Sequence, residues 1–139
     1  MKKTIINNKD VRNFTLEIIR QMNVDVFVPE VVIGFARGGL IPANFISQWY
    51  GIPMYCLNKD EEYTFEFLQH KKILVIDDIN DTGNTLYNFN VNYKKDLKFK
   101  YAALIENSTS MFQTDYAGLF INKNEDPHWI VFPWEIWWH

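Results

Sequence analysis

Two adjacent aspartates, Asp77 and Asp78, directly follow four apolar residues, Ile73 to Ile76. Neighbouring carboxylates at the end of a buried strand repel each other unless a cation or a hydrogen-bond donor lies against them. A sugar diol, a magnesium ion or both would meet this need. The alternative is a pair of acids that only solvates the end of a strand. We therefore treat the pair as a candidate site for a hydroxylated or metal-bound ligand.

A short polar turn follows the acid pair, with the sequence Asp81-Thr82-Gly83-Asn84-Thr85. Because the turn opens a predicted helix, it offers backbone N–H groups that lack helical partners, together with two hydroxyls. It is not a Walker A loop, since no Gly-Lys-Ser/Thr follows. An ordinary helix cap is the alternative, because Asp and Thr are favoured there. The acid pair could bind sugar hydroxyls, and the turn close behind it could bind a phosphate. This arrangement matches the diol and the 5-phosphate of a ribose phosphate.

The elements around these residues alternate between strands and helices. Apolar spacing predicts helices over 9–22, 40–50 and from about 82, strands over 31–36, 52–57, 73–76 and 100–106, and short strands around Pro127 and Pro133. Strands separated by helices indicate an α/β fold with a mostly parallel sheet. Ligands of such sheets bind beyond the carboxyl ends of the strands, where both "ARGG" and "DDINDTGNT" lie.

Length and composition predict one globular domain, residues 1–139, with 47% apolar residues. The single cysteine, Cys56, excludes a disulfide framework or a Cys-rich zinc site. A net charge of −3 without a basic block argues against nucleic acid as a partner. No apolar run approaches the roughly 20 residues that span a bilayer, and the N-terminal residues lack a secretory pattern. We expect a cytoplasmic protein with no membrane partner.

Three stretches resemble a known family. "VIDDINDTGNTL" resembles the phosphoribosyl pyrophosphate binding motif of the type I phosphoribosyltransferases: an apolar run, two acids, two variable residues, then Asp-Thr-Gly-x-Thr. "VVIGFARGGLIPA" is similar to the pyrophosphate loop of this family, and "WIVFPWE" to the base-binding tail of its xanthine-guanine branch. The resemblance covers most of the chain. It implies the type I phosphoribosyltransferase fold, with a small C-terminal hood formed largely by residues 115–139.

The resemblance also implies roles for the acids and the turn. Asp77 and Asp78 would hold the ribose hydroxyls, directly or through Mg²⁺, and Asp81 would handle the proton on the five-membered ring of the base. The 5-phosphate would be held by the amides and hydroxyls of Thr82, Gly83, Asn84 and Thr85. Pyrophosphate would bind at Ala36, Arg37, Gly38 and Gly39, where the peptide that enters the arginine is often cis in this family.

Base recognition is implied for the tail. Trp129 would stack on the purine, and Ile130 and Val131 would offer backbone groups to its edge. The xanthine-guanine branch reads the six-position oxygen with a lysine, and counting back from "DYAGL" places Glu106 there. A carboxylate accepts hydrogen bonds and repels a carbonyl, so Glu106 would suit an exocyclic amine or a different base.

The expected function is magnesium-dependent transfer of phosphoribose from phosphoribosyl pyrophosphate to a nucleobase, with a purine expected. The products would be a nucleoside monophosphate and pyrophosphate, as in purine salvage. One alternative is a regulatory protein that binds phosphoribosyl pyrophosphate with lost or weak catalysis, which the short acidic segment from Leu57 to Gln69 favours and Asp81 with a complete "ARGG" disfavours. The other alternative, a receiver-like or phosphatase domain, does not explain "DTGNT".

Tryptophan is concentrated at the end of the chain. Three of the five tryptophans lie among the last six residues. Such a tail is difficult to bury in a small monomer, so we expect a homo-oligomer, either a dimer or a tetramer.

Overall fold

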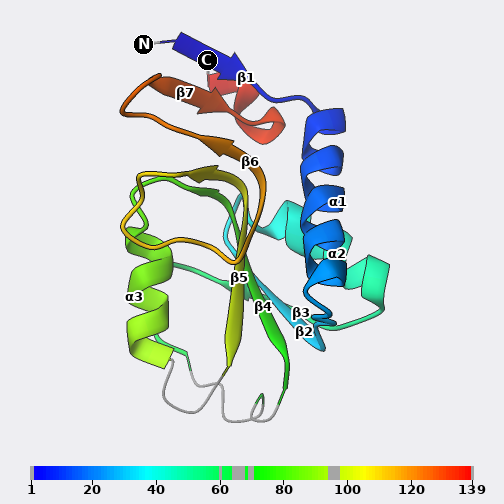
Figure 1. Cartoon of the computed structure of the whole chain (residues 1–139). Coiled ribbons are helices and arrows are strands. Elements are labelled where there is room, and N and C mark those ends of the chain that lie inside the picture. Colours follow the sequence, from blue (N-terminus) through cyan, green and yellow to red (C-terminus); the bar gives the residue numbers. More distant parts are fainter. Residues whose placement is uncertain (1, 60, 64–67, 69–70, 94–97, 139) are drawn as a thin grey trace.

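The computed structural model describes residues 2–59, 61–63, 68, 71–93 and 98–138, with the backbone alone at 136–138. Its main sheet has five parallel strands in the order β3-β2-β4-β5-β6. The strands are β2 (Val31–Phe35), β3 (Met54–Leu57), β4 (Ile73–Asn80), β5 (Phe99–Asn107) and β6 (Tyr116–Ile121). Helices α1 (Asn8–Val24) and α2 (Leu40–Tyr50) cover one face, and α3 (Asn84–Tyr93) covers the other (Figure 1). The predicted α/β class is confirmed.

Strand β4 lies at the centre of the sheet, and its side chains alternate between two buried layers. Leu74 and Ile76 pack on the side of α1 and α2, whereas Ile73 and Val75 pack on the side of α3. All four are fully buried. A parallel sheet covered on both faces needs such a continuous apolar run, which is why the sequence pattern located this strand correctly.

The strand continues beyond its apolar run, however, and ends at Asn80. Asp77 and Asp78 therefore belong to the strand, because the ladder between β4 and β5 extends through Asp77 opposite Ala103. Helix α3 begins at Asn84, two residues later than expected. The segment between strand and helix is thus a compact turn.

Local signals fix the ends of the two N-terminal helices. The side-chain oxygen of Asn7 accepts from Asp10 N at 2.7 Å, and the Asp10 carboxylate accepts from Asn7 N at 3.0 Å, which forms a capping box. Gly51 ends α2 with a φ of 65°, in the left-handed region that glycine adopts readily. The bounds of α2 agree with the helix predicted over residues 40–50.

A second, two-stranded parallel sheet pairs β1 (Lys2–Ile5) with β7 (His128–Val131), and the 3₁₀ helix η2 (Pro133–Trp138) follows it. In Figure 1 this sheet lies above the end of the main sheet toward which β4 and β5 run. Residues 115–139, expected to form most of a hood, are divided: β6 joins the main sheet beside β5, and the N-terminal strand β1 completes the second sheet. Strand β1, whose four residues include two lysines, was not predicted from the sequence.

The sequence YTFEFL suggests a further short strand over residues 63–68, and this stretch lies largely outside the described ranges. Among the described residues, no helix has both the length and the apolar character needed to cross a membrane.

Candidate active site

The two strand-end motifs meet in one cavity of about 380 Å³ beyond the ends of β2 and β4. Its described lining comprises Phe35, Ala36, Arg37, Gly38, Lys59, Asp77, Asp78, Ile79, Asn80, Asp81, Thr82, Gly83, Asn84 and Thr85. The fold therefore brings "ARG" and "DDINDTGNT" together although some forty residues separate them. This placement follows the rule that open parallel sheets bind ligands at the carboxyl ends of their strands.

The segment after β2 is held close to β4. The peptide bond between Ala36 and Arg37 is cis. A Cβ atom at Gly38 would lie 1.9 Å from Oδ2 of Asp78, and one at Gly39 would lie 2.7 Å from the carbonyl oxygen of Ile76. Both positions thus require glycine for close approach, Gly38 to a side chain and Gly39 to backbone.

This difference predicts separate consequences for two alanine substitutions. Gly38→Ala forces the Asp78 side chain to move, so we expect binding of phosphoribosyl pyrophosphate to weaken by about 100-fold, the order of loss that small misplacements cause. The free energy of unfolding of the Gly38→Ala variant should change little, because the Asp78 side chain can rotate away from the added methyl group. Gly39→Ala meets backbone atoms and should destabilise the fold by about 1–3 kcal/mol. Calorimetric titration and urea unfolding of both variants test this contrast, and a Gly38→Ala protein that binds normally would contradict it.

The two aspartates are partly buried and hydrogen-bonded to their own strand. Oδ1 of Asp77 accepts from Asp78 N, and Oδ1 of Asp78 accepts from Ile79 N, both at 2.8 Å. Burial raises the pKa of Asp77 well above its ordinary value, and the charge of Asp78 raises it further. Burial also raises the pKa of Asp78, and the carboxylate of Glu135 contributes in the same direction. The site thus disfavours its own negative charge and would gain from a bound cation.

Glu135, on η2, was not assigned a role from the sequence. The sequence feature that could have identified Glu135 is an acidic residue in an otherwise aromatic tail. Its proximity to Asp78, however, depends on how η2 packs. Within the described residues, no three His, Cys, Asp or Glu side chains are grouped as a metal site. Mg²⁺ commonly binds through one or two carboxylates together with phosphate oxygens and water. The acid pair fits a magnesium ion that is shared with a ligand.

The turn between β4 and α3 forms the other end of the cavity. Gly83 has a φ of 93°, and a Cβ atom there would lie 2.6 Å from Phe112 N, so glycine is required on both counts. Tyr87 N donates to the Gly83 carbonyl and starts the helical hydrogen bonds. The amides of Thr82 to Thr85 precede or open α3, where an anion is favoured. The turn has the geometry expected of a phosphate cradle.

Asp81 is joined to two residues that the sequence analysis did not select. Nζ of Lys123, in the segment after β6, lies 2.7 Å from Oδ2 of Asp81. Nδ2 of Asn107, at the end of β5, donates to the backbone oxygen of Asp81 at 3.1 Å and to Oδ1 at 3.3 Å. No local pattern marks either residue, because each reaches Asp81 only through the packing of distant segments.

The structure corrects the expectation for Glu106. This residue is fully buried, and its carboxylate accepts hydrogen bonds from Asn80 Nδ2, from Ser110 Oγ and from both the backbone N and Oγ1 of Thr114. It does not line the cavity, and its hydrogen bonds hold the 110–114 segment to the sheet. The physical reason is the alternation of side chains along a strand: the next residue, Asn107, faces Asp81 instead.

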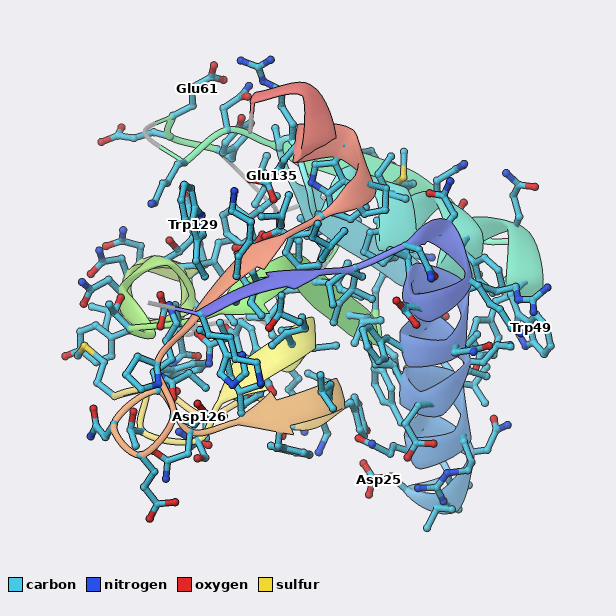
Figure 2. All side chains as sticks on the ribbon, turned by 90° about the horizontal axis from the view of Figure 1, so that it is seen from above. Asp25, Trp49, Glu61, Asp126, Trp129 and Glu135 are labelled. Atoms are coloured by element: carbon cyan, nitrogen blue, oxygen red, sulfur yellow. The ribbon has the colours of Figure 1, made fainter. Side chains whose placement is uncertain are left out.

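The residues expected to bind the base lie in the second sheet and do not line the cavity. Ile130 and Val131 are buried in β7, and the carbonyl of Val131 accepts from Ile6 N. Trp129 is 46% exposed, with Nζ of Lys3 at 5.0 Å from its ring centroid. Figure 2 shows Trp129 and Glu135 on the side of the molecule where Glu61 lies, and Trp49 on the opposite side.

Comparison with known proteins decides the class of this fold. No protein-family model and no curated protein matches the chain. A solved structure of purine phosphoribosyltransferase from Pyrococcus horikoshii is 28% identical, covers 97% of this chain and 95% of its own, and superposes with a TM-score of 0.79. The chain has the type I phosphoribosyltransferase fold.

Two further structures support the same fold at lower identity. Xanthine-guanine-hypoxanthine phosphoribosyltransferase from Helicobacter pylori is 24% identical over 96% of this chain and 93% of its own, with a TM-score of 0.77. A hypoxanthine-guanine phosphoribosyltransferase from Bacillus anthracis is 17% identical over 82% of this chain and 78% of its own, with a TM-score of 0.66. The expectation of an enzyme of the phosphoribosyltransferase class, similar to the purine branch, is confirmed.

Proposed function

We propose that this phosphoribosyltransferase transfers the phosphoribosyl group of phosphoribosyl pyrophosphate to a purine base in a magnesium-dependent reaction. The observation that carries the proposal is the single cavity that joins the acid pair, the polar turn and the segment containing Arg37. Its arrangement supports a ligand with phosphate at one end, a diol in the middle and pyrophosphate at the other. The similar Pyrococcus horikoshii protein is named a purine phosphoribosyltransferase.

Each part of the cavity is assigned one portion of the substrate. Asp77 and Asp78 hold the ribose hydroxyls, and Thr82 to Thr85 hold the 5-phosphate with amides and hydroxyls. Ala36, Arg37, Gly38 and Gly39 bind the pyrophosphate. Magnesium, held by the acid pair together with ligand oxygens, would neutralise charge on the departing pyrophosphate.

The reaction itself asks for positioning more than for covalent catalysis. A ring nitrogen of the base forms a bond to the anomeric carbon while the bond from that carbon to pyrophosphate oxygen breaks with its electron pair. Positive charge on the ribose is greatest in the transition state, when both of these bonds are partly formed. The carboxylates of Asp77 and Asp78 stabilise this charge. The proton that leaves the other nitrogen of the five-membered ring passes to Asp81. The rest of the rate enhancement comes from two effects: the site holds both substrates in the reactive orientation, and it excludes water.

The wider setting is also part of the proposal. We assign the chain, residues 1–139, to one cytoplasmic catalytic domain that works as a homo-oligomer, with phosphoribosyl pyrophosphate and a purine as its partners. Support for oligomerisation comes from large apolar side chains left exposed on α2 and β3, including Ile41, Trp49 and Met54. Light scattering after gel filtration measures the oligomeric state, and a monomer at micromolar concentration would contradict this part.

A pyrophosphate-release assay tests the proposed activity. The purified protein is incubated with phosphoribosyl pyrophosphate and magnesium against hypoxanthine, guanine, xanthine, adenine, uracil and nicotinate, with an EDTA-treated control. We expect release with at least one purine and none without magnesium. Magnesium-dependent binding of phosphoribosyl pyrophosphate without release for any base would contradict catalysis and favour a regulatory pocket.

A further inference from the structure

A buried polar network joins the carboxyl ends of β4 and β5. Glu106 is fully buried, and Asn80 is only 3% exposed. The carboxylate of Glu106 accepts hydrogen bonds from Nδ2 of Asn80 at 2.5 Å, from the backbone N of Thr114 at 3.0 Å and from Oγ1 of Thr114. Replacing a buried polar network by apolar groups of the same shape is often neutral or stabilising. Stability alone therefore does not explain why the chain has this network.

Asn80 links the network to the segment that follows β5. Its side-chain nitrogen has two hydrogens, and besides Glu106 it donates to the carbonyl oxygen of Phe112 at 2.6 Å. Asn80 occupies one of the two variable positions of the motif "DDINDTGNT", so the family resemblance assigns it no role. Glu106 thus holds residues 110–114 in two ways, directly through Thr114 and indirectly through Asn80.

Residues 110–114 in turn pack against the polar turn between β4 and α3. The backbone N of Met111 donates to the carbonyl oxygen of Thr82 at 2.8 Å. A Cβ atom at Gly83 would lie 2.6 Å from the backbone N of Phe112 and 3.1 Å from that of Met111. The segment therefore supports the turn at two of the four residues that are assigned to the 5-phosphate.

We propose that Glu106 is a positioning residue that fixes the polar turn in the conformation that binds the 5-phosphate. This inference rests on the proposed function. Donors of a phosphate site are most effective when they are oriented before the ligand binds, and a fully hydrogen-bonded buried network provides that rigidity. The pyrophosphate is assigned to the segment after β2, which lies on the other side of β4 from β5. Glu106 should therefore act on one end of the substrate only.

Glu106→Gln tests the assignment by calorimetric titration with two ligands, ribose 5-phosphate and magnesium pyrophosphate. Glutamine keeps the shape of the side chain, but its amide nitrogen is a donor. That nitrogen would face either Nδ2 of Asn80 or the backbone N of Thr114, donor to donor. We expect the affinity for ribose 5-phosphate to fall by about 10- to 100-fold, as for a small misplacement of binding groups. The affinity for magnesium pyrophosphate should stay unchanged.

Thr114→Val is a milder second variant, because it removes one hydroxyl donor to Glu106 and keeps the backbone donor. It should weaken binding of ribose 5-phosphate by about 3- to 10-fold, as expected for one lost hydrogen bond. Thr15→Val is the matched control. Thr15 is fully buried in α1, where its Oγ1 donates to the carbonyl oxygen of Val11 at 2.8 Å. This control loses a hydroxyl hydrogen bond as well, but it should leave the affinities for both ligands unchanged.

Circular dichroism establishes that each variant is folded at the temperature of the titration, and Thr114→Val decides the test if Glu106→Gln does not fold. Equal loss of affinity for both ligands would overturn the inference, since Glu106 would then only support the fold. Unchanged affinity for ribose 5-phosphate in a folded variant would also overturn it, because the turn would keep its conformation without the network. A wild type that binds neither ribose 5-phosphate nor magnesium pyrophosphate would instead overturn the proposed function itself.

Discussion

Replacing Asp81 by asparagine should lower the rate of phosphoribosyl transfer by about 10²- to 10⁴-fold, the contribution typical of a positioned proton-transfer group. Asparagine has nearly the same shape, and its amide oxygen can still accept from Nδ2 of Asn107. It cannot take up the proton that leaves the base. Asp77 and Asp78, and not Asp81, are assigned to hold the ribose of phosphoribosyl pyrophosphate. This substrate should therefore bind to the variant almost as tightly as to the wild type.

Single-turnover kinetics and calorimetric titration of phosphoribosyl pyrophosphate separate these two quantities. Asp126→Asn serves as a control, because Asp126 is an exposed aspartate that pairs with His128 as Asp81 pairs with Lys123. The control should retain both binding and turnover. If Asp81→Asn lost binding and turnover equally, Asp81 would be a ligand for phosphoribosyl pyrophosphate, and its assigned role in proton transfer would be wrong.

Asp77→Asn should have opposite effects on stability and on function. Burial raises the pKa of Asp77, so this carboxyl destabilises the magnesium-free fold at neutral pH, where the same group in the unfolded chain is ionised in water. The amide removes that charge, and its oxygen can keep the hydrogen bond from Asp78 N. We expect the free energy of unfolding to rise by about 0.5–2 kcal/mol, while magnesium-dependent binding of phosphoribosyl pyrophosphate is lost.

The sign of the pH dependence follows from the same shift. A carboxyl whose pKa is higher in the folded than in the unfolded state destabilises the fold most above the folded pKa. This cost falls as pH decreases through that pKa and disappears below the ordinary aspartate value of about 3.9. Urea unfolding without magnesium at several pH values measures it. The increase in the free energy of unfolding caused by Asp77→Asn should therefore be largest at pH 7–8 and become smaller at acidic pH. A variant less stable than the wild type at pH 8 would contradict the account.

Much of the site was predictable because its chemistry depends on short-range sequence. The apolar run Ile73 to Ile76 marked a strand buried on both faces, and the polar turn after it could only lie at the carboxyl end of that strand. The same rule placed Arg37 at the end of β2. Parallel strands meet at one edge, so the two motifs could be brought together before the structure was known.

The parts that were not predictable depend on register and on long-range packing. Glu106 and Asn107 are adjacent, and an offset of one residue along a strand exchanges the side that faces the site. Lys123 reaches Asp81 across 42 positions of sequence, and no local pattern records that contact. Strand β1 lacks a clear apolar alternation, and its partner β7 lies at the other end of the chain.

The most direct test of the central claim follows a labelled base into the product. The protein is incubated with phosphoribosyl pyrophosphate, magnesium and one ¹⁵N-labelled purine at a time, namely hypoxanthine, guanine, xanthine or adenine, and each mixture is analysed by mass spectrometry. The account predicts the labelled ribonucleoside 5′-monophosphate of at least one of these bases and an equal amount of pyrophosphate, with no product from Asp81→Asn on the same timescale. Recovery of all four bases unchanged, with phosphoribosyl pyrophosphate either intact or merely hydrolysed, would contradict it.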